Sequence, residues 1–123
     1  MYENTGIDIK EHNDIAVVEF TVANICDIVA IEAMSKVIKQ FICEHNPGKM
    51  VVDFTAVKFF TSQILGLLLD VWRKLRASNG EVVISGINPQ LYRVFKITNL
   101  DKIFKFFPDR ETAVKSFETA AGK

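Results

Sequence analysis

Hydrophobic and polar side chains alternate along the first part of the chain with the period of a β-strand. Residues 7–11 (IDIKE) alternate between apolar and polar up to Lys10, and a second β-type run covers residues 15–22 (IAVVEFTV) after the polar residues 12–14. Two such runs on either side of a short polar turn predict an antiparallel hairpin.

Two longer segments follow the period of a helix. Residues 28–45 carry one apolar stripe, made of Ile31, Met34, Val37, Ile38, Phe41 and Ile42. That spacing predicts a helix packed on one face, which ends at Asn46-Pro47-Gly48. A second helix is predicted from about Ser62, and Asn79-Gly80 gives it a left-handed exit. Its apolar face is Ile64, Leu65, Leu68, Leu69, Trp72 and Leu75.

Short apolar runs separate the helices and predict buried strands. Residues 50–54 and 81–85 are rich in valine, as is typical of central strands in a parallel sheet. Residues 104–107 predict a last strand. Each of the two valine-rich strands is followed by a helical segment, which indicates βαβ crossovers.

Capping residues mark the last two helices. Asn88 is a suitable N-cap, with Pro89 at the first position of a short helix that runs to about Ile97. Asp109 is a suitable N-cap for a final helix. The resulting order predicts an α/β fold with a mixed, mostly parallel sheet of about five strands and about four helices.

Length and charge narrow the class of protein. The 123 residues suit one domain, so residues 1–123 are expected to form a single domain. Fifteen basic and fifteen acidic residues give a formal net charge of zero. A neutral chain has no overall field that attracts DNA, RNA or anionic lipid, so we expect no nucleic-acid partner.

Cysteine usage and hydropathy bear on the compartment. Two cysteines, Cys26 and Cys43, are too few for the disulfide framework of a small secreted domain. The polar N-terminal residues show no signal-peptide core, and no apolar stretch approaches the roughly 20 residues of a membrane span. These features predict a cytoplasmic protein with no membrane span.

Most motifs of catalysis and cofactor binding are missing from the sequence. There is no P-loop, no dinucleotide-binding glycine fingerprint and no nucleophile elbow. His12 and His45 have no partners at zinc-ligand spacing, so neither a metal nor another cofactor is expected. Asp53 ends a predicted buried strand, where it serves either as a loop-capping group or as a catalytic base.

Two hydroxyls, Thr61 and Ser62, stand at the predicted start of the second long helix. Serine and threonine are ordinary N-caps there, and such a cap contributes about 1 kcal/mol. The same position lies at the positive end of the helix dipole, which tolerates an anion. A phosphate on Ser62 would therefore add charge to the surface without unfolding the helix.

Residues 50–89 also resemble the STAS domain of anti-sigma factor antagonists, and the resemblance extends over about residues 7–119. The family pattern has a buried strand, a loop, a D-S-S/T-G-L-G motif, an apolar helix and a second apolar strand. Here the motif reads Thr61-Ser62-Gln63-Ile64-Leu65-Gly66. Thr61 replaces the family's Asp, Gln63 its second hydroxyl and Ile64 its first Gly.

The resemblance implies a regulatory protein-binding module and no enzyme. Ser62 matches the serine that a partner serine kinase phosphorylates, and the family's unphosphorylated domain binds an anti-sigma factor kinase. Asp27 loosely matches an acidic residue beside that serine. We expect Asp27, Thr61, Gln63 and Ile64 to contribute to partner binding. Phe59, Phe60 and Ile64 are candidates for an exposed apolar rim, with at least one of the two phenylalanines in the core.

Two other interpretations stay open. The altered motif also suits a STAS adaptor or scaffold subunit that is not phosphorylated, as in stressosome-like or lipid-transport complexes. A small hydrolase or nucleotide-binding domain would use Asp53 and Ser62, although no general base accompanies them. A homodimer through the apolar residues at 104–107 is a further possibility.

Overall fold

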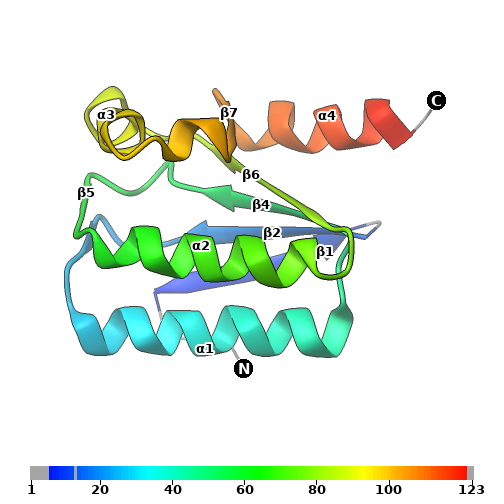
Figure 1. The fold of residues 1–123 in the computed structure, drawn as a ribbon, viewed down its shortest axis with the longest axis horizontal. Helices are drawn as coiled ribbons and strands as arrows, with labels where there is room; N and C mark the ends of the chain where they lie inside the picture. The colour runs from blue at the N-terminus through cyan, green and yellow to red at the C-terminus, as the bar shows by residue number, and fades with distance from the viewer. Residues whose placement is uncertain (1–5, 13, 122–123) are drawn as a thin grey trace.

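A five-stranded mixed sheet forms the centre of the protein, with helices on both faces (Figure 1). The computed structural model describes residues 6–12 and 14–121. In spatial order the strands are β1 (Ile7–His12), β2 (Ile15–Phe20), β4 (Lys49–Asp53), β6 (Glu81–Ser85) and β7 (Lys105–Phe107). β1 is antiparallel to β2, and the other neighbours are parallel. The predicted fold class is confirmed.

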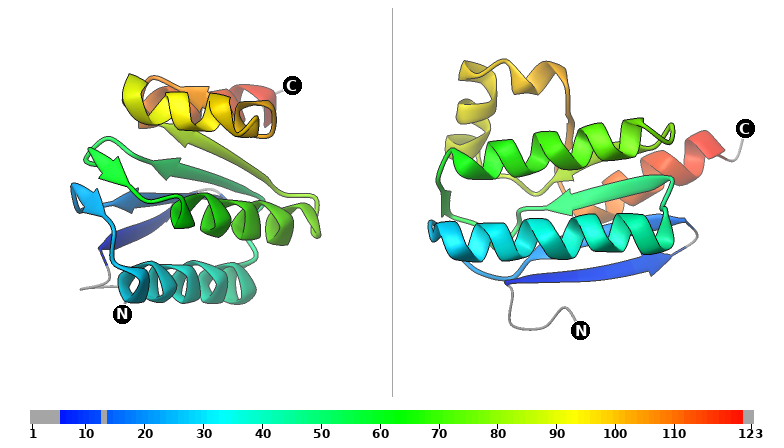
Figure 2. Two further views of the ribbon diagram at one scale, coloured as in Figure 1. Left: turned by 60° about the vertical axis from the view of Figure 1, so that its left-hand side comes forward. Right: turned by 60° about the horizontal axis from the view of Figure 1, so that its bottom comes forward.

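The helices divide between the two faces of the sheet (Figure 2). They are α1 (Ile28–His45), α2 (Gln63–Arg76), α3 (Pro89–Ile97) and α4 (Arg110–Ala121), with a single 3₁₀ turn η1 (Leu100–Lys102). Side chains of α1, α2 and α3 share one core cluster, whereas α4 packs on the opposite face. Among the described helices, none combines the length and the hydropathy that crossing a membrane requires.

A second, very short pair of strands was missed by the sequence analysis. β3 (Asn24–Ile25) pairs in parallel with β5 (Phe59–Phe60). Two residues are too few to show an alternation of polar and apolar side chains, so the sequence pattern does not predict either strand. This pair joins the loop before α1 to the loop before α2.

The predicted caps are present at α3 and α4. Asn88 Oδ1 accepts a hydrogen bond from Leu91 N at 2.9 Å, and Asp109 Oδ1 accepts one from Thr112 N at 2.7 Å. The bond from the backbone of Thr112 holds the pKa of the Asp109 carboxyl below its ordinary value. The cap therefore supports α4 at neutral pH, and this support is lost as the pH falls through the lowered pKa.

Phenylalanine rings fill the core beneath the carboxyl ends of the strands. The Phe54 ring lies 5.0 Å from that of Phe20, 5.8 Å from that of Phe60 and 6.5 Å from that of Phe95. Phe95 also contacts Phe104 in an edge-on arrangement. The edge-on contacts stabilise the core beyond the burial of apolar area, because aromatic pairs favour that geometry.

The apolar segment considered for a homodimer is largely used within the chain. Phe104 is buried, and Phe106 packs edge-on against Phe95 at 5.2 Å and against Tyr92 at 4.8 Å. Phe107 packs in the cluster under α4. Phe106 and Phe107 are half-buried, so part of each ring is already covered within the chain.

The core position of α3 can be tested with two variants of that helix. Phe95→Ala removes a ring that is 0% exposed and is expected to lower the free energy of unfolding by about 3–5 kcal/mol. Ile97→Ala is the matched control, because Ile97 is 74% exposed and its truncation should change stability by less than about 0.5 kcal/mol. Urea denaturation measures both, and equal losses would contradict this packing.

Candidate functional site

The first turns of α1 and α2 lie side by side at one end of the molecule, next to β5 (Figure 1). The β3–β5 pair brings them together, and Thr61 N donates a hydrogen bond to Ile25 O at 3.1 Å. The segment before α1 therefore borders the start of α2, as the resemblance implies. Two positive helix ends at one surface favour an anion there.

Ser62 is exposed and directly precedes the first residue of α2. Its φ of −62° and ψ of −15° are already helical, and its side chain makes no capping hydrogen bond. Backbone carbonyls of Thr61 and Ser62 instead accept the N–H groups of Ile64 and Leu65. Ser62 therefore occupies the N-cap position of α2 without a capping bond from its side chain, and its hydroxyl is accessible and uncommitted.

Two of the other polar candidates are the chain neighbours of Ser62, and the third starts α1. Thr61 Oγ1 lies 3.3 Å from Gln63 Oε1, so these two side chains contact each other across the serine. Gln63 is exposed and Thr61 half-buried. Asp27 is the N-cap of α1, where its Oδ1 accepts the N–H of Val29 at 3.0 Å.

The expected apolar rim is wrong for Ile64, and Phe60 is the phenylalanine that belongs to the core. Ile64 is 0% exposed and Phe60 only 6%, because both side chains point into the core, so the side chain of Ile64 cannot contact a partner. Phe59 is 53% exposed, as expected. The rim is completed by Ile28 and Val29, which are 52% and 72% exposed.

Sequence reasoning missed these two residues of α1. Val29 is an apolar residue outside the apolar stripe of the helix. An apolar residue at such a position is the one sequence feature that could have indicated an exposed apolar side chain here. Large apolar side chains that face solvent next to one another are typical of interaction surfaces.

A groove between α1 and α2 begins beside Ser62 and encloses about 240 Å³. Its charged side chains are both acidic, Glu32 and Asp70. Asp70 also bridges the two helices through Lys39 Nζ at 3.3 Å. Residues lining the groove are Ile28, Ile31, Glu32, Ser35, Gln63, Gly66, Leu67 and Asp70.

Gly66 leaves open space at this groove. A Cβ atom added there would meet no atom within 4 Å, so packing within the chain does not require a glycine. A glycine inside a helix costs about 0.5–1 kcal/mol relative to alanine. The open position lets another molecule approach the backbone of α2 closely.

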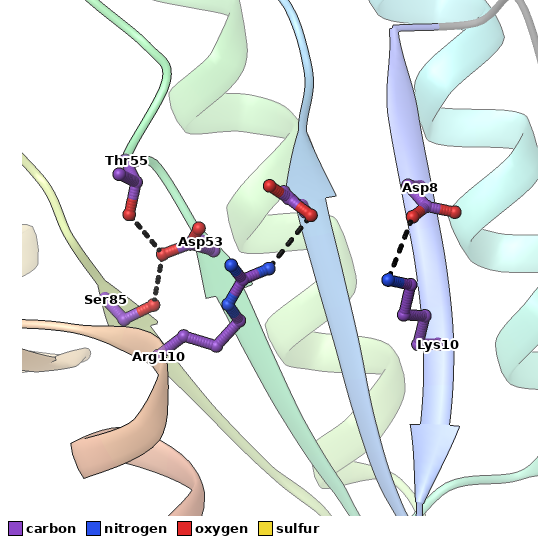
Figure 3. Close-up of polar contacts among 7 residues, drawn as sticks. Asp8, Lys10, Asp53, Thr55, Ser85 and Arg110 are labelled. Atoms are coloured by element: carbon purple, nitrogen blue, oxygen red, sulfur yellow. Dashed lines mark hydrogen bonds and ion pairs between the residues drawn. The ribbon is translucent and has the colours of Figure 1, made fainter.

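Asp53 is fully buried and lies in a polar cluster with Ser85 and Thr55 (Figure 3). Its Oδ1 accepts hydrogen bonds from Ser85 Oγ at 2.7 Å and Thr55 Oγ1 at 2.9 Å. Figure 3 also shows Arg110 reaching to β2, where it pairs with Glu19 at 2.9 Å.

The hydrolase hypothesis, which joins Asp53 to Ser62, is not supported by this geometry. Val51 packs against α4, and Asp53 shares its face of the sheet because side chains alternate along a strand. α2 packs on the opposite face. The structure therefore assigns Asp53 to anchoring the ends of β4 and β6, in line with the loop-capping alternative.

The family model for the STAS domain matches residues 6–113. The chain belongs to the STAS domain family. Among curated proteins, this STAS chain is 22% identical to the anti-sigma F factor antagonist of Paenibacillus polymyxa, over 96% of the chain and 99% of that relative.

Solved STAS structures show the same fold. The anti-sigma factor antagonist SpoIIAA in its unphosphorylated form aligns with a TM-score of 0.81 at 19% identity, over 92% of this chain and 96% of that one. The Bacillus cell fate determinant SpoIIAA in the phosphorylated form aligns with a TM-score of 0.72 at 18% identity, over 90% and 98%.

Two glycine variants test the description of Gly66. Gly66→Ala is expected to raise the free energy of unfolding by about 0.5–1 kcal/mol, because it adds no clash and improves helix propensity. Gly86→Ala is the contrasting variant, since Gly86 has φ +67° and an added Cβ would meet Thr55 and Asp53. It should lose about 1–3 kcal/mol. Thermal and urea unfolding measure both, and a loss at Gly66 would mean that its glycine is structural.

Proposed function

We propose that this STAS chain is a regulatory protein-binding module of the anti-sigma factor antagonist type, which a partner serine kinase switches by phosphorylating Ser62. The observation that carries the proposal is the exposed, unbonded hydroxyl of Ser62 where the first turns of α1 and α2 meet. A kinase needs such access to its acceptor. The curated relative named as an anti-sigma F factor antagonist supports the class of partner.

The docking face would consist of the apolar rim Ile28, Val29 and Phe59 around Ser62, together with the groove between α1 and α2. Burial of these side chains against a partner removes apolar area from water and favours the complex. Gln63 and Thr61 would supply hydrogen bonds at the centre. Asp27 would act mainly by fixing the start of α1.

Phosphorylation would oppose docking through charge. A phosphoserine carries about −1.5 to −2 charges at neutral pH, and the helix N-termini tolerate it while the face is in water. Inside a contact with the apolar rim the same charge would lose its hydration. Glu32 lines the groove together with Gln63, so a phosphate on Ser62 would add to its negative charge and increase the repulsion of an incoming acidic surface.

The adaptor interpretation keeps the docking face and removes the switch. It is favoured by the contact between Thr61 and Gln63 and by the buried Ile64, because these are the positions at which the chain departs from the family motif. In either case the chain would act by binding and not by catalysis.

Phosphoryl transfer tests the proposal directly. Serine kinases encoded near the gene, incubated with the chain and ATP, are expected to add one phosphoryl group, which intact-protein mass spectrometry detects and peptide mapping places on Ser62. Ser62→Ala should abolish the modification. Ser35→Ala is the matched control, because Ser35 lines the same groove but is not at a helix start, and it should be modified like wild type.

Other outcomes of this experiment have defined meanings. Modification of Thr61 alone would make Thr61, and not Ser62, the acceptor of the phosphoryl group. A chain that stays unmodified while it binds those kinases or another partner through the apolar rim would support the adaptor interpretation and overturn the switch.

A further inference from the structure

The outward face of α3 combines exposed apolar and basic side chains. Pro89, Tyr92, Arg93, Lys96 and Ile97 follow the three- and four-residue spacing of one helical stripe, opposite the buried Leu91 and Phe95. They line a surface hollow of about 420 Å³. Ile97 is 74% exposed, although α3 already buries its other face in the core.

The positive charge of this stripe is not balanced within the described part of the chain. No ion pair there involves Arg93 or Lys96. α3 itself contains no acidic residue. A second hollow of about 440 Å³ shares Pro89 with the first and adds Lys58, again without an acidic side chain.

Part of the stripe is held rigid from beneath. The Tyr92 ring packs edge-on against Phe106 at 4.8 Å, and Asn88 caps the helix through Leu91 N. Asn88 Nδ2 also donates to Val57 O at 3.4 Å, which ties the start of α3 to the loop before β5. A preorganised tyrosine beside an arginine is typical of the residues that dominate binding energy at protein interfaces.

We propose that the α3 stripe, defined as Pro89, Tyr92, Arg93, Lys96 and Ile97, is a second docking surface that binds an acidic helical segment of a partner protein. An apolar side chain of that segment would enter the hollow beside Tyr92 and Ile97, and its carboxylates would pair with Arg93 and Lys96. The stripe spans nine residues, about 13 Å of helix, which matches two to three turns of a bound helix.

A protein segment fits these observations better than a membrane does. The surface is hollowed, so it accepts an inserted side chain, whereas a bilayer presents a broad plane. The chain also has no net charge to draw it to anionic lipid. This surface does not depend on Ser62, so the proposal survives if the phosphorylation switch is wrong.

An array of immobilised helical peptides provides the test. The peptides share one spacing and vary the apolar anchor (Leu, Ile, Met, Phe or Trp) and the flanking charge (Glu, Gln or Lys), and labelled wild-type protein is the probe. We expect the Glu series to bind above the Gln series and the Lys series to bind least. Arg93→Glu brings the summed charge of Arg93 and Lys96 to zero, so it should weaken the Glu series about tenfold and remove the preference for Glu over Lys.

Matched controls distinguish binding at the α3 stripe from nonspecific binding elsewhere on the protein. Lys36→Glu makes the same change of charge on α1 and should bind like wild type. Ile97→Ser should lower binding to every anchor, whereas Ile103→Ser, an exposed apolar position outside the stripe and outside the docking face around Ser62, should not. Far-UV circular dichroism and urea unfolding check that each variant is folded.

Three results would overturn the proposal. Equal binding of the Glu, Gln and Lys series would remove the charge argument. Sedimentation with phosphatidylserine vesicles through Arg93 and Lys96, without binding to Glu peptides, would assign the stripe to a membrane. Self-association of the free chain that Ile97→Ser abolishes, without binding to Glu peptides, would assign it to a second copy.

Discussion

Burial of the Phe60 ring is the contact on which the geometry of the candidate site depends. Phe60 is 6% exposed, and its ring lies 5.8 Å from that of Phe54 and 6.1 Å from that of Phe95. Since β5 is only two residues long, its few hydrogen bonds to β3 would hold it weakly without this anchor. Ser62 follows Phe60 by two residues, so the packing of Phe60 in the core fixes the position of the Ser62 hydroxyl. The hydroxyl therefore needs no hydrogen bond of its own to hold that position.

Under the proposed function, the same arrangement would give one surface two states in a single fold. Placing the first turns of α1 and α2 together creates a region that accepts negative charge, while Ile28, Val29 and Phe59 around it favour contact with another protein. A charge added at Ser62 would therefore be tolerated by the free protein but not inside a complex. The α3 stripe has the opposite composition, with basic groups around apolar ones, so the two faces would select different partners.

Periodicity in the sequence was sufficient for the sheet and the long helices, because apolar stripes such as that of α1 are long and regular. It did not reveal the β3–β5 pair, whose two-residue strands carry no period. It placed Ile64 correctly on the apolar face of α2, whereas the expectation that Ile64 contacts a partner came from its position in the family motif and is wrong. The exposed Val29 and Ile97 were missed for the related reason that single apolar residues off a stripe predict nothing by themselves.

The central claim is that a phosphate on Ser62 changes the docking surface and leaves the fold intact. It is tested most directly by producing the chain with phosphoserine at position 62 and comparing its amide NMR spectrum and urea unfolding with those of the unmodified chain. The account predicts shift changes confined to the ends of β3 and β5 and the first turns of α1 and α2, with a free energy of unfolding changed by less than about 1 kcal/mol. Shift changes throughout the sheet, or a large loss of stability, would contradict it.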